Sequence, residues 1–506
     1  MKKYAFILIF IITACVSGTK RSPSSENKKL LDDLNHFREV VQSGLVDQKS
    51  CPEYFGQAVN LFFDERIYDY SPEDKEALKN IIRSTWQTRL AIHSHLADYH
   101  QACTNELRQI FYKLRSIEDL ADIAYYKEEP LSAADFTGEK DFQKQQVPLV
   151  QNEFYHGYLG AQGQFETMED VKSVLKNGDM MVTIGASDFS AVLATMPEYP
   201  GFLDHLVYIH KDEEHGLQSI ESYATPQGEA PNNGTGVQFY DIDFALKNVN
   251  PRILLLRLKP QYSELAEKAA NDFYDLVIEK RKSKQPITYD YLMKVTDPSK
   301  MTCASVPLWA LRNASHDQFV IPEQKSNLRA GLEPIYKSTG MNTAPLLTAS
   351  DIELDSRFDL LLEFRDHRLI EDIRIRHIAA RVVENWMIEK DYRLLPTYKT
   401  ILLNLFIFPL HLEKLASLPP GAPPGFVKTL DELTQTIEVL VAQLKKQQSK
   451  RRAEHKWSMS LNEMMAFLET YRQNEVSDCQ NSSNAKRGPL HLHYAPANLT
   501  CVKATY

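Results

Sequence analysis

The spacing of hydrophobic positions changes twice along the chain and divides it into three stretches. From about Lys28 to Tyr126, apolar residues recur every three or four positions, as in the runs LLDDLNHFREVV and IEDLADIAYY. This spacing places the apolar side chains on one face of a helix. The period is lost over residues 127–147, which carry mixed charges. We therefore expect an N-terminal helical region over 28–147.

The middle stretch has the pattern of a sheet. From about Pro148, short runs rich in β-branched and aromatic residues alternate with polar turns: MMVTIG, HLVYIH, LQSIES, TGVQFY and RILLLRL. Such runs predict an antiparallel sheet. An amphipathic helix is expected next, over 263–283. Beyond Thr348 the helical period returns and persists to about Gln473. The predicted fold class is α+β, with helical regions before and after the sheet and an irregular tail over 476–506.

Composition and charge limit the functions to consider. With 43% hydrophobic and 25% charged residues, the chain has the composition of an ordinary globular protein. A formal net charge of -9 argues against a nucleic-acid partner, because neutralising phosphates requires an excess of clustered Lys and Arg. No cofactor is expected.

The first residues resemble a bacterial export signal. Lys2 and Lys3 precede an apolar run, Tyr4–Ile12, which is too short to span a bilayer and is typical of a signal peptide. We expect this signal peptide to cover residues 1–14. The signal could end at a lipidated cysteine, as described next. The alternatives are an ordinary cleaved signal and an uncleaved short anchor. In each case the rest of the protein is expected to be exported.

The residues that end this signal, ITAC at positions 12–15, resemble a lipobox, in which the cysteine is acylated and becomes the new N-terminus. Cys15 would then anchor the chain in a membrane, with a polar tether over 15–27. Because Val16 rather than Asp follows the cysteine, sorting to the outer membrane, facing the periplasm, is expected.

Four further cysteines are even in number: Cys51, Cys103, Cys479 and Cys501. An oxidising compartment permits disulfides. Pairing of sequence neighbours, Cys51 with Cys103 and Cys479 with Cys501, is the simplest of three connectivities. Buried free thiols are the alternative.

A histidine and a carboxylate fall on neighbouring predicted strands. His205 begins the run HLVYIH, and Glu221 lies near the end of LQSIES. A short turn joins the runs, so they should pair as a hairpin and bring Glu221 beside His205. A carboxylate there would orient the imidazole and stabilise its cation. Asp241, Asp243 or a neutral side chain are competitors for this role, and a solvent-facing Glu221 is the structural alternative.

Cys303 is the candidate nucleophile. It follows a polar turn, TDPSK, and opens a helix-like run. The positive end of a helix dipole favours a thiolate. Paired with His205, Cys303 would be activated for attack on a carbonyl, and its backbone amide could donate to the resulting oxyanion.

These residues, in this order, resemble the YiiX-like, circularly permuted members of the NlpC-type papain-fold hydrolases. The matching elements are Gly178-Asp179, His205-Leu206-Val207, Ile220-Glu221, Tyr289-Asp290 and Cys303. The segment TASDIELDSRFDLL resembles the family's closing region. The resemblance implies a permuted papain-like catalytic domain over 148–365, followed by a C-terminal helical region over 366–475.

The residues on both sides of the cysteine depart from the family pattern. The family commonly has Tyr before the cysteine and Ser-Glu-Leu after it, whereas Thr302 precedes Cys303 and Ala304-Ser305-Val306 follow it. Side-chain assistance to an oxyanion is therefore in question, while the Cys, His and Glu remain. Tyr289 and Asp290 are interpreted as packing and turn residues rather than substrate contacts.

The resemblance implies cleavage of an amide bond through a Cys303 thioester, and export makes a cell-wall peptide the expected substrate. A lipid acyl hydrolase or acyltransferase of the same fold is the alternative enzyme. A non-catalytic envelope scaffold is the alternative from another class. His210 and His215 are five residues apart across a predicted turn, which is not the i, i+4 spacing of zinc proteases. His491 and His493 would lie on one side of a strand, but such a pair in a terminal tail is usually chance, so no metal site is predicted.

Overall fold

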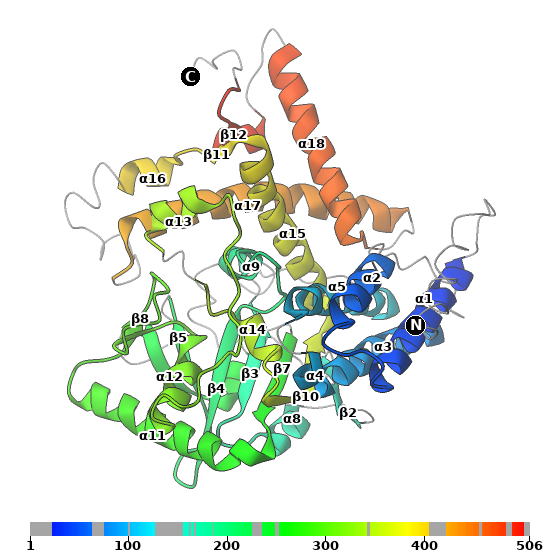
Figure 1. Cartoon of the computed structure of the whole chain (residues 1–506). Helices are drawn as coiled ribbons and strands as arrows, with labels where there is room; N and C mark the ends of the chain where they lie inside the picture. The colour runs from blue at the N-terminus through cyan, green and yellow to red at the C-terminus, as the bar shows by residue number, and fades with distance from the viewer. Residues whose placement is uncertain are drawn as a thin grey trace.

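A mixed α+β fold is built around an eight-stranded sheet in which every neighbouring pair is antiparallel (Figure 1). Its strand order is β2-β1-β10-β7-β3-β4-β5-β6. The strands are β1 (Tyr155–Leu159), β2 (Gly163–Phe165), β3 (Met180–Ile184), β4 (His205–Asp212), β5 (Gly216–Tyr223), β6 (Gly236–Asp241), β7 (Arg252–Leu258) and β10 (Phe358–Asp366).

The computed structural model describes residues 23–62, 75–99, 102–126, 155–160, 163–165, 168–185, 187–224, 235–247, 252–341, 345–403, 421–454, 458–481 and 488–499. The signal peptide, Cys15 and the predicted boundary over 127–147 lie outside these ranges. Within them, no helix combines the length and the apolar character needed to cross a bilayer.

Both faces of the sheet are buried, because alternate side chains of a strand point to opposite sides. On β7, Leu254 and Leu256 belong to one hydrophobic core, while Ile253 and Leu255 belong to the other. This arrangement explains why the strands read as nearly continuous apolar runs rather than as alternating ones.

One face is covered by α11 (Ser263–Lys282), α12 (Ser305–Ala314) and α14 (Ala349–Glu353). The face that α11 buries carries small side chains, with Ala266, Ala269 and Ala270 beside Phe273 and Val277. Its Lys and Glu residues lie on the other side, as the amphipathic pattern predicts.

The other face is covered by helices from two parts of the chain. They are α8 (Met168–Val174), α9 (Asp188–Thr195), α10 (Ile242–Lys247), α15 (His367–Lys390), α17 (Pro424–Ala453), α18 (Leu461–Asn481) and α19 (Pro489–His493). Figure 1 shows α15, α17 and α18 rising on the side of the sheet away from α11. Because one core joins these helices to the strands, the C-terminal helices pack directly on the sheet.

The remaining elements are short and connect these layers. They are α13 (Glu333–Thr339), α16 (Tyr398–Leu402), the two-stranded pair β8 (Thr288–Tyr289) and β9 (Lys300–Met301), and the pair β11 (Tyr392–Leu394) and β12 (Tyr494–Pro496).

The N-terminal helices form a separate core beside the sheet (Figure 1). They are α1 (Pro23–Gln42), α2 (Cys51–Leu61), α3 (Lys75–Ser94), α4 (Leu96–Tyr99) and α5 (Thr104–Tyr126). A disulfide joins Cys51 to Cys103, with 5.9 Å between their Cα atoms. This is the pairing expected from the sequence. Cys479 is also disulfide-bonded, but Cys501 lies outside the described residues, so that pairing stays a prediction.

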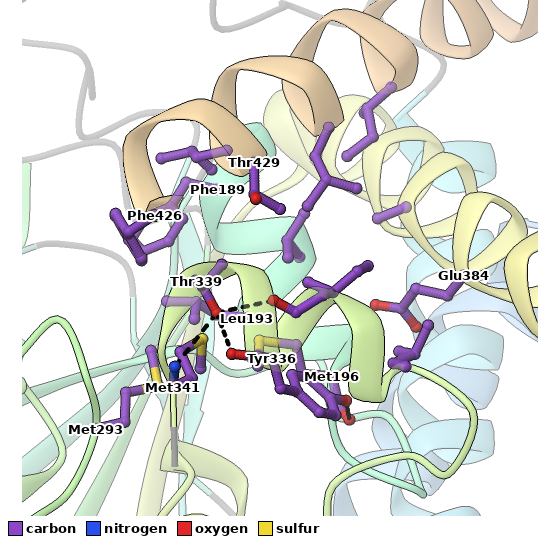
Figure 2. A pocket seen from close by; sticks show the side chains of 17 residues that line it. Phe189, Leu193, Met196, Met293, Tyr336, Thr339, Met341, Glu384, Phe426 and Thr429 are labelled. Atoms are coloured by element: carbon purple, nitrogen blue, oxygen red, sulfur yellow. Dashed lines mark hydrogen bonds between the residues drawn. The ribbon is translucent and has the colours of Figure 1, made fainter. Parts of the chain in front are cut away.

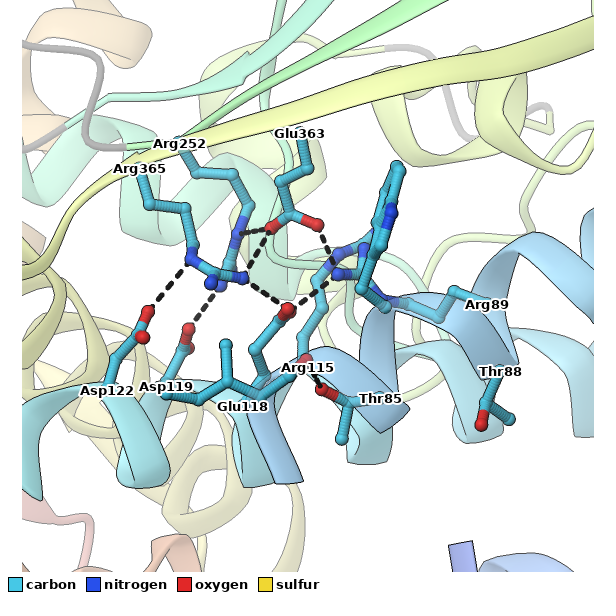
Figure 3. Close-up of polar contacts among 12 residues, drawn as sticks. Thr85, Thr88, Arg89, Arg115, Glu118, Asp119, Asp122, Arg252, Glu363 and Arg365 are labelled. Carbon is cyan, nitrogen blue, oxygen red and sulfur yellow. Dashed lines mark hydrogen bonds and ion pairs between the residues drawn. The ribbon is translucent and has the colours of Figure 1, made fainter. Parts of the chain in front are cut away.

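A buried ionic cluster fastens the N-terminal helices to the sheet (Figure 3). The sheet contributes Arg252 from β7, and Glu363 and Arg365 from β10. These side chains contact charged side chains of α3 and α5. The ion pairs are Arg89–Glu118 at 2.5 Å, Arg252–Glu363 at 2.7 Å, Arg365–Asp122 at 2.8 Å, and Arg89–Glu363, Arg252–Asp119 and Arg365–Glu118. All of these side chains are at most 2% exposed. Each charge is compensated by opposite charges, as burial requires.

Three expectations from the sequence need correction. The tether was expected to extend to residue 27, but α1 begins at Pro23 and the side chain of Asn27 is fully buried. The stretch beyond Thr348 was expected to be helical, but β10 lies there, between β1 and β7. The tail was expected to be irregular, but α18 extends to Asn481, and β12 pairs with β11 around the buried Tyr494.

Candidate functional site

His205 and Glu221 form a hydrogen-bonded pair on the β4–β5 hairpin. The ladder pairs Tyr208 with Ile220, and counting on in this register places Tyr223 opposite His205, with Glu221 diagonally across. Diagonal neighbours are within reach of long side chains. His205 Nε2 lies 2.8 Å from Glu221 Oε2, and the His205 ring stacks on Tyr223 with 4.9 Å between centroids.

The Glu221 carboxylate is fully buried and held from several sides. Ser219 donates its hydroxyl to Oε1 at 2.6 Å, and Tyr223 donates its hydroxyl to Oε2 at 2.5 Å. Since both donors lie two residues away on the same strand, they share its face with Glu221. The carboxylate therefore has a defined orientation toward the imidazole.

Cys303 lies where a helix is about to begin. It precedes α12 by two residues and is 7% exposed. Its thiol lies 3.7 Å from the carbonyl oxygen of Asp204, the residue directly before His205. Cys303 is also the free cysteine among the described residues. Cys303 and His205, almost a hundred positions apart in sequence, therefore meet at the start of β4.

The charge environment favours an imidazolium at His205. Burial alone would lower the pKa of His205, but the negative charge and hydrogen bonding of Cys303, and then those of Glu221, raise that pKa well above 6.5. Since Nε2 is engaged with Glu221, Nδ1 is the ring nitrogen left for the thiol. The three residues have the connectivity cysteine–imidazole–carboxylate, an arrangement that can activate a thiol.

A cavity of about 460 Å³, including space open to solvent, adjoins the thiol. Its wall is largely aliphatic, with Leu193, Leu203, Met293, Leu346 and Leu347 among the side chains that line it. Polar groups are few, and they cluster near Cys303. A cavity of this size with a few convergent polar groups has the character of a substrate site.

The segment after β8 shapes one side of this cavity. The Asp290 carboxylate accepts from the amides of Leu292 and Val295, both at 3.1 Å. This turn holds Met293 and Val295 at positive φ values of 50° and 52°, which for a β-branched residue is a strained backbone. Asp290 thus acts as the turn residue that the sequence predicts. Tyr289, by contrast, lines the cavity.

Two groups are available to stabilise an oxyanion at Cys303. No acceptor in the described part of the chain takes the Cys303 amide N–H. The buried Tyr289 has a pKa raised well above 10 by burial and by the nearby Cys303 charge, so its hydroxyl keeps its proton. Thr302 is committed elsewhere, because its hydroxyl oxygen accepts from the Ser305 amide at 3.2 Å.

The other candidates from the sequence lie apart from this site. Asp241 accepts from the amide of Asp243, and Asp243 pairs with Lys172. His210 stacks on Tyr274, with 4.0 Å between centroids.

The histidines considered as metal ligands pair with neighbouring carboxylates, His210 and His215 with Asp212 and His491 with Glu475. No group of three or more potential ligands of a metal ion occurs among the residues that the structure describes. His491 is buried in the middle of α19 beside Glu475, so it lies in a short helix and not in a strand.

Sequence reasoning missed the groups that position Glu221 and those that shape the cavity. Ser219 and Tyr223 could have been found, because both share the strand face of Glu221. Leu346 and Leu347 carry no local signal, since they reach the thiol only through the tertiary fold.

Comparisons with known proteins add no name to this geometry. The chain matches no family model, no curated protein and no solved structure.

Proposed function

We propose that this protein is a cysteine hydrolase that cleaves a carboxylic acid derivative through a thioester on Cys303. The observation that carries the proposal is the arrangement of Cys303, His205 and Glu221, with the imidazole bonded to the carboxylate at 2.8 Å and its pKa raised by the cysteine. Perturbed titratable groups beside a cavity are the usual mark of a catalytic site.

The reaction begins when the Cys303 thiolate attacks the substrate carbonyl carbon and a C–S bond forms. The His205 imidazolium gives its proton to the leaving nitrogen or oxygen as the bond to that atom breaks. The neutral imidazole then takes a proton from water, and the water oxygen attacks the thioester. Cleavage of the C–S bond releases the carboxylic acid and restores the thiolate and the imidazolium.

Two groups stabilise the negative oxygen that forms in each half of the reaction. The Cys303 amide and the Tyr289 hydroxyl are the donors that this cavity offers. Such donors act most strongly where water is excluded.

Two substrate classes follow from this chemistry. Export makes a cell-wall peptide one candidate. The lining of the cavity favours the other, a lipid ester or N-acyl amide, because aliphatic side chains surround the thiol and match an alkyl group better than a polar peptide.

The wider setting of the proposal is a permuted papain-like fold in an exported, lipid-anchored protein. The antiparallel sheet, with the histidine on one strand and the cysteine before a packed helix, supports the fold. The Cys51–Cys103 disulfide supports export, since such bonds persist in oxidising compartments. Lipidation predicts that labelled palmitate is incorporated into the wild type and not into Cys15→Ala.

The test compares hydrolysis of purified muropeptides and of acyl lipids by the wild type, Cys303→Ala and His205→Asn. His215→Asn is the matched control, because His215 is a histidine on the far, exposed end of the same hairpin. We expect the two site variants to lose the activity and the control to keep it. Activity retained by Cys303→Ala would refute the proposal, and inactivity of the wild type on both substrate classes would leave the scaffold alternative.

A further inference from the structure

A second cavity, called the rear cavity below, adjoins the front cavity beside Cys303, and Figure 2 shows the side chains that line it. Its volume is about 570 Å³, including space open to solvent. Residues of α9, α13, α15 and α17 line it. Phe189 and Val192 of α9 and Phe426 and Leu430 of α17 contribute to its wall.

The polar groups in this wall already have partners. The Glu384 carboxylate accepts from Thr195 at 2.9 Å and from Arg329 at 3.2 Å. The Thr339 hydroxyl donates to the Ile335 carbonyl at 3.0 Å, and the Thr429 hydroxyl is hydrogen-bonded to the Ser338 hydroxyl at 2.9 Å. A ligand here would find apolar surface and no free polar group to orient it, so an apolar ligand is the one that fits.

Leu193 and Met293 line both cavities, so the two spaces lie on opposite sides of the same pair of side chains. One hydrophobic cluster also joins the two walls, since it contains Met341 of the rear cavity and Leu346 of the front one. Met293 is unbranched and adapts its shape easily. A chain attached to a carbonyl at Cys303 would therefore continue past Met293 into apolar space.

We propose that the rear cavity binds the aliphatic chain of an acyl substrate whose carbonyl is attacked by Cys303. The inference rests on the proposed function and narrows its substrate to long-chain acyl esters or amides. It also assigns a role to the C-terminal helices, because α17 supplies one wall of the chain-binding site.

The test measures kcat/KM for p-nitrophenyl acetate, hexanoate and dodecanoate at monomer concentrations. Each methylene that enters an apolar site contributes at most about fourfold, so we expect dodecanoate to exceed acetate by at least about tenfold. Val192→Phe places a larger side chain in the rear cavity and should reduce the dodecanoate-to-acetate ratio by at least about fivefold. Val320→Phe is the matched control, because Val320 is 41% exposed and lines none of these cavities; its ratio should equal that of the wild type.

A binding measurement distinguishes failure of the proposed hydrolase activity from failure of the proposed chain-binding site. Calorimetry measures dodecanoate binding to Cys303→Ala and to the same protein with Val192→Phe, where binding should weaken. Hydrolysis of acetate without any gain for longer chains would overturn the chain site and leave the hydrolase. Dodecanoate binding that Val192→Phe weakens, without hydrolysis of any ester, would support the chain site and overturn the hydrolase. Neither hydrolysis nor binding would overturn both.

Discussion

At the scale of single residues, the site depends on how Glu221 and Cys303 together act on His205. Glu221 is held by Ser219 and Tyr223, so the carboxylate can neither turn away nor be solvated. A fixed, buried anion stabilises an imidazolium more than a mobile exposed one does. Despite burial, the pKa of His205 is raised, first by the charge and hydrogen bonding of Cys303 and then by this carboxylate.

Replacing Glu221 by Gln should shift the pH dependence of activity. Because the folded pKa of His205 is raised, the imidazolium persists above pH 6.5 and is lost as the pH rises through that folded pKa. The alkaline limb of the kcat/KM profile reports this loss. Removing one anionic neighbour should move the limb to lower pH by about one unit. An unchanged limb would mean that Glu221 does not act on the imidazole.

Replacing Tyr289 by Phe tests the oxyanion donor. Loss of a single donor of this kind usually lowers kcat by about 10²–10³-fold. We expect a fall in kcat with little change in KM, since the hydroxyl acts on the transition state. Tyr291→Phe is the matched control, because its hydroxyl donates to the Ala224 carbonyl, and Tyr291 does not line the nucleophile's cavity. A rise in KM alone would assign Tyr289 to substrate packing.

At the scale of elements, the ionic cluster decides how the N-terminal helices are attached. Glu363 on β10 faces Arg89 on α3 and Arg252 on β7. Burial would raise the pKa of Glu363, but these arginines and Arg365 lower it below its usual value. The contact therefore requires a negative charge at Glu363 between positive charges, and it joins α3 to the sheet directly.

Glu363→Gln should destabilise the fold by about 3–5 kcal/mol, because buried arginines would lose a compensating charge. Urea unfolding followed by circular dichroism measures the change. Asp272→Asn is the control, since the Lys268–Asp272 pair is about half exposed and such pairs contribute under about 1 kcal/mol. Equal effects of the two substitutions would contradict a structural role for the cluster.

The sequence predicted some elements well and others poorly, for physical reasons. The five apolar runs between Met180 and Leu258 correspond to β3 to β7, since a strand buried on both faces has an unmistakable composition. β10 was missed because Glu363 and Arg365 look like solvent-facing residues. Only the tertiary fold shows that they are buried against α3 and α5.

At the scale of the whole molecule, segments far apart in the sequence build the candidate site. His205 and Glu221 could be paired in advance because one short turn joins their strands. The position of α17 over the rear cavity could not be predicted from the sequence. Helical periodicity shows which face of a helix is apolar, but it does not show which element covers that face. How the two helical regions pack on the sheet is therefore apparent only in the folded structure.

The Cys51–Cys103 disulfide should contribute to the stability of the whole chain. It closes a loop of 52 residues, for which chain entropy predicts about 4 kcal/mol. Cys51→Ser with Cys103→Ser should lower the free energy of unfolding by roughly that amount and leave the rate of alkylation at Cys303 unchanged. A change in stability of less than about 1 kcal/mol would contradict the entropic argument.

The central claim is that Cys303 forms a covalent acyl intermediate. The most direct measurement is the mass of the protein, and of its Cys303 peptide, after brief mixing with p-nitrophenyl dodecanoate and quenching in acid. A thioester mechanism requires one dodecanoyl group on Cys303 in the wild type and none in Cys303→Ala. Release of nitrophenol with no acyl group on Cys303, or the same acylation in Cys303→Ala, would contradict it.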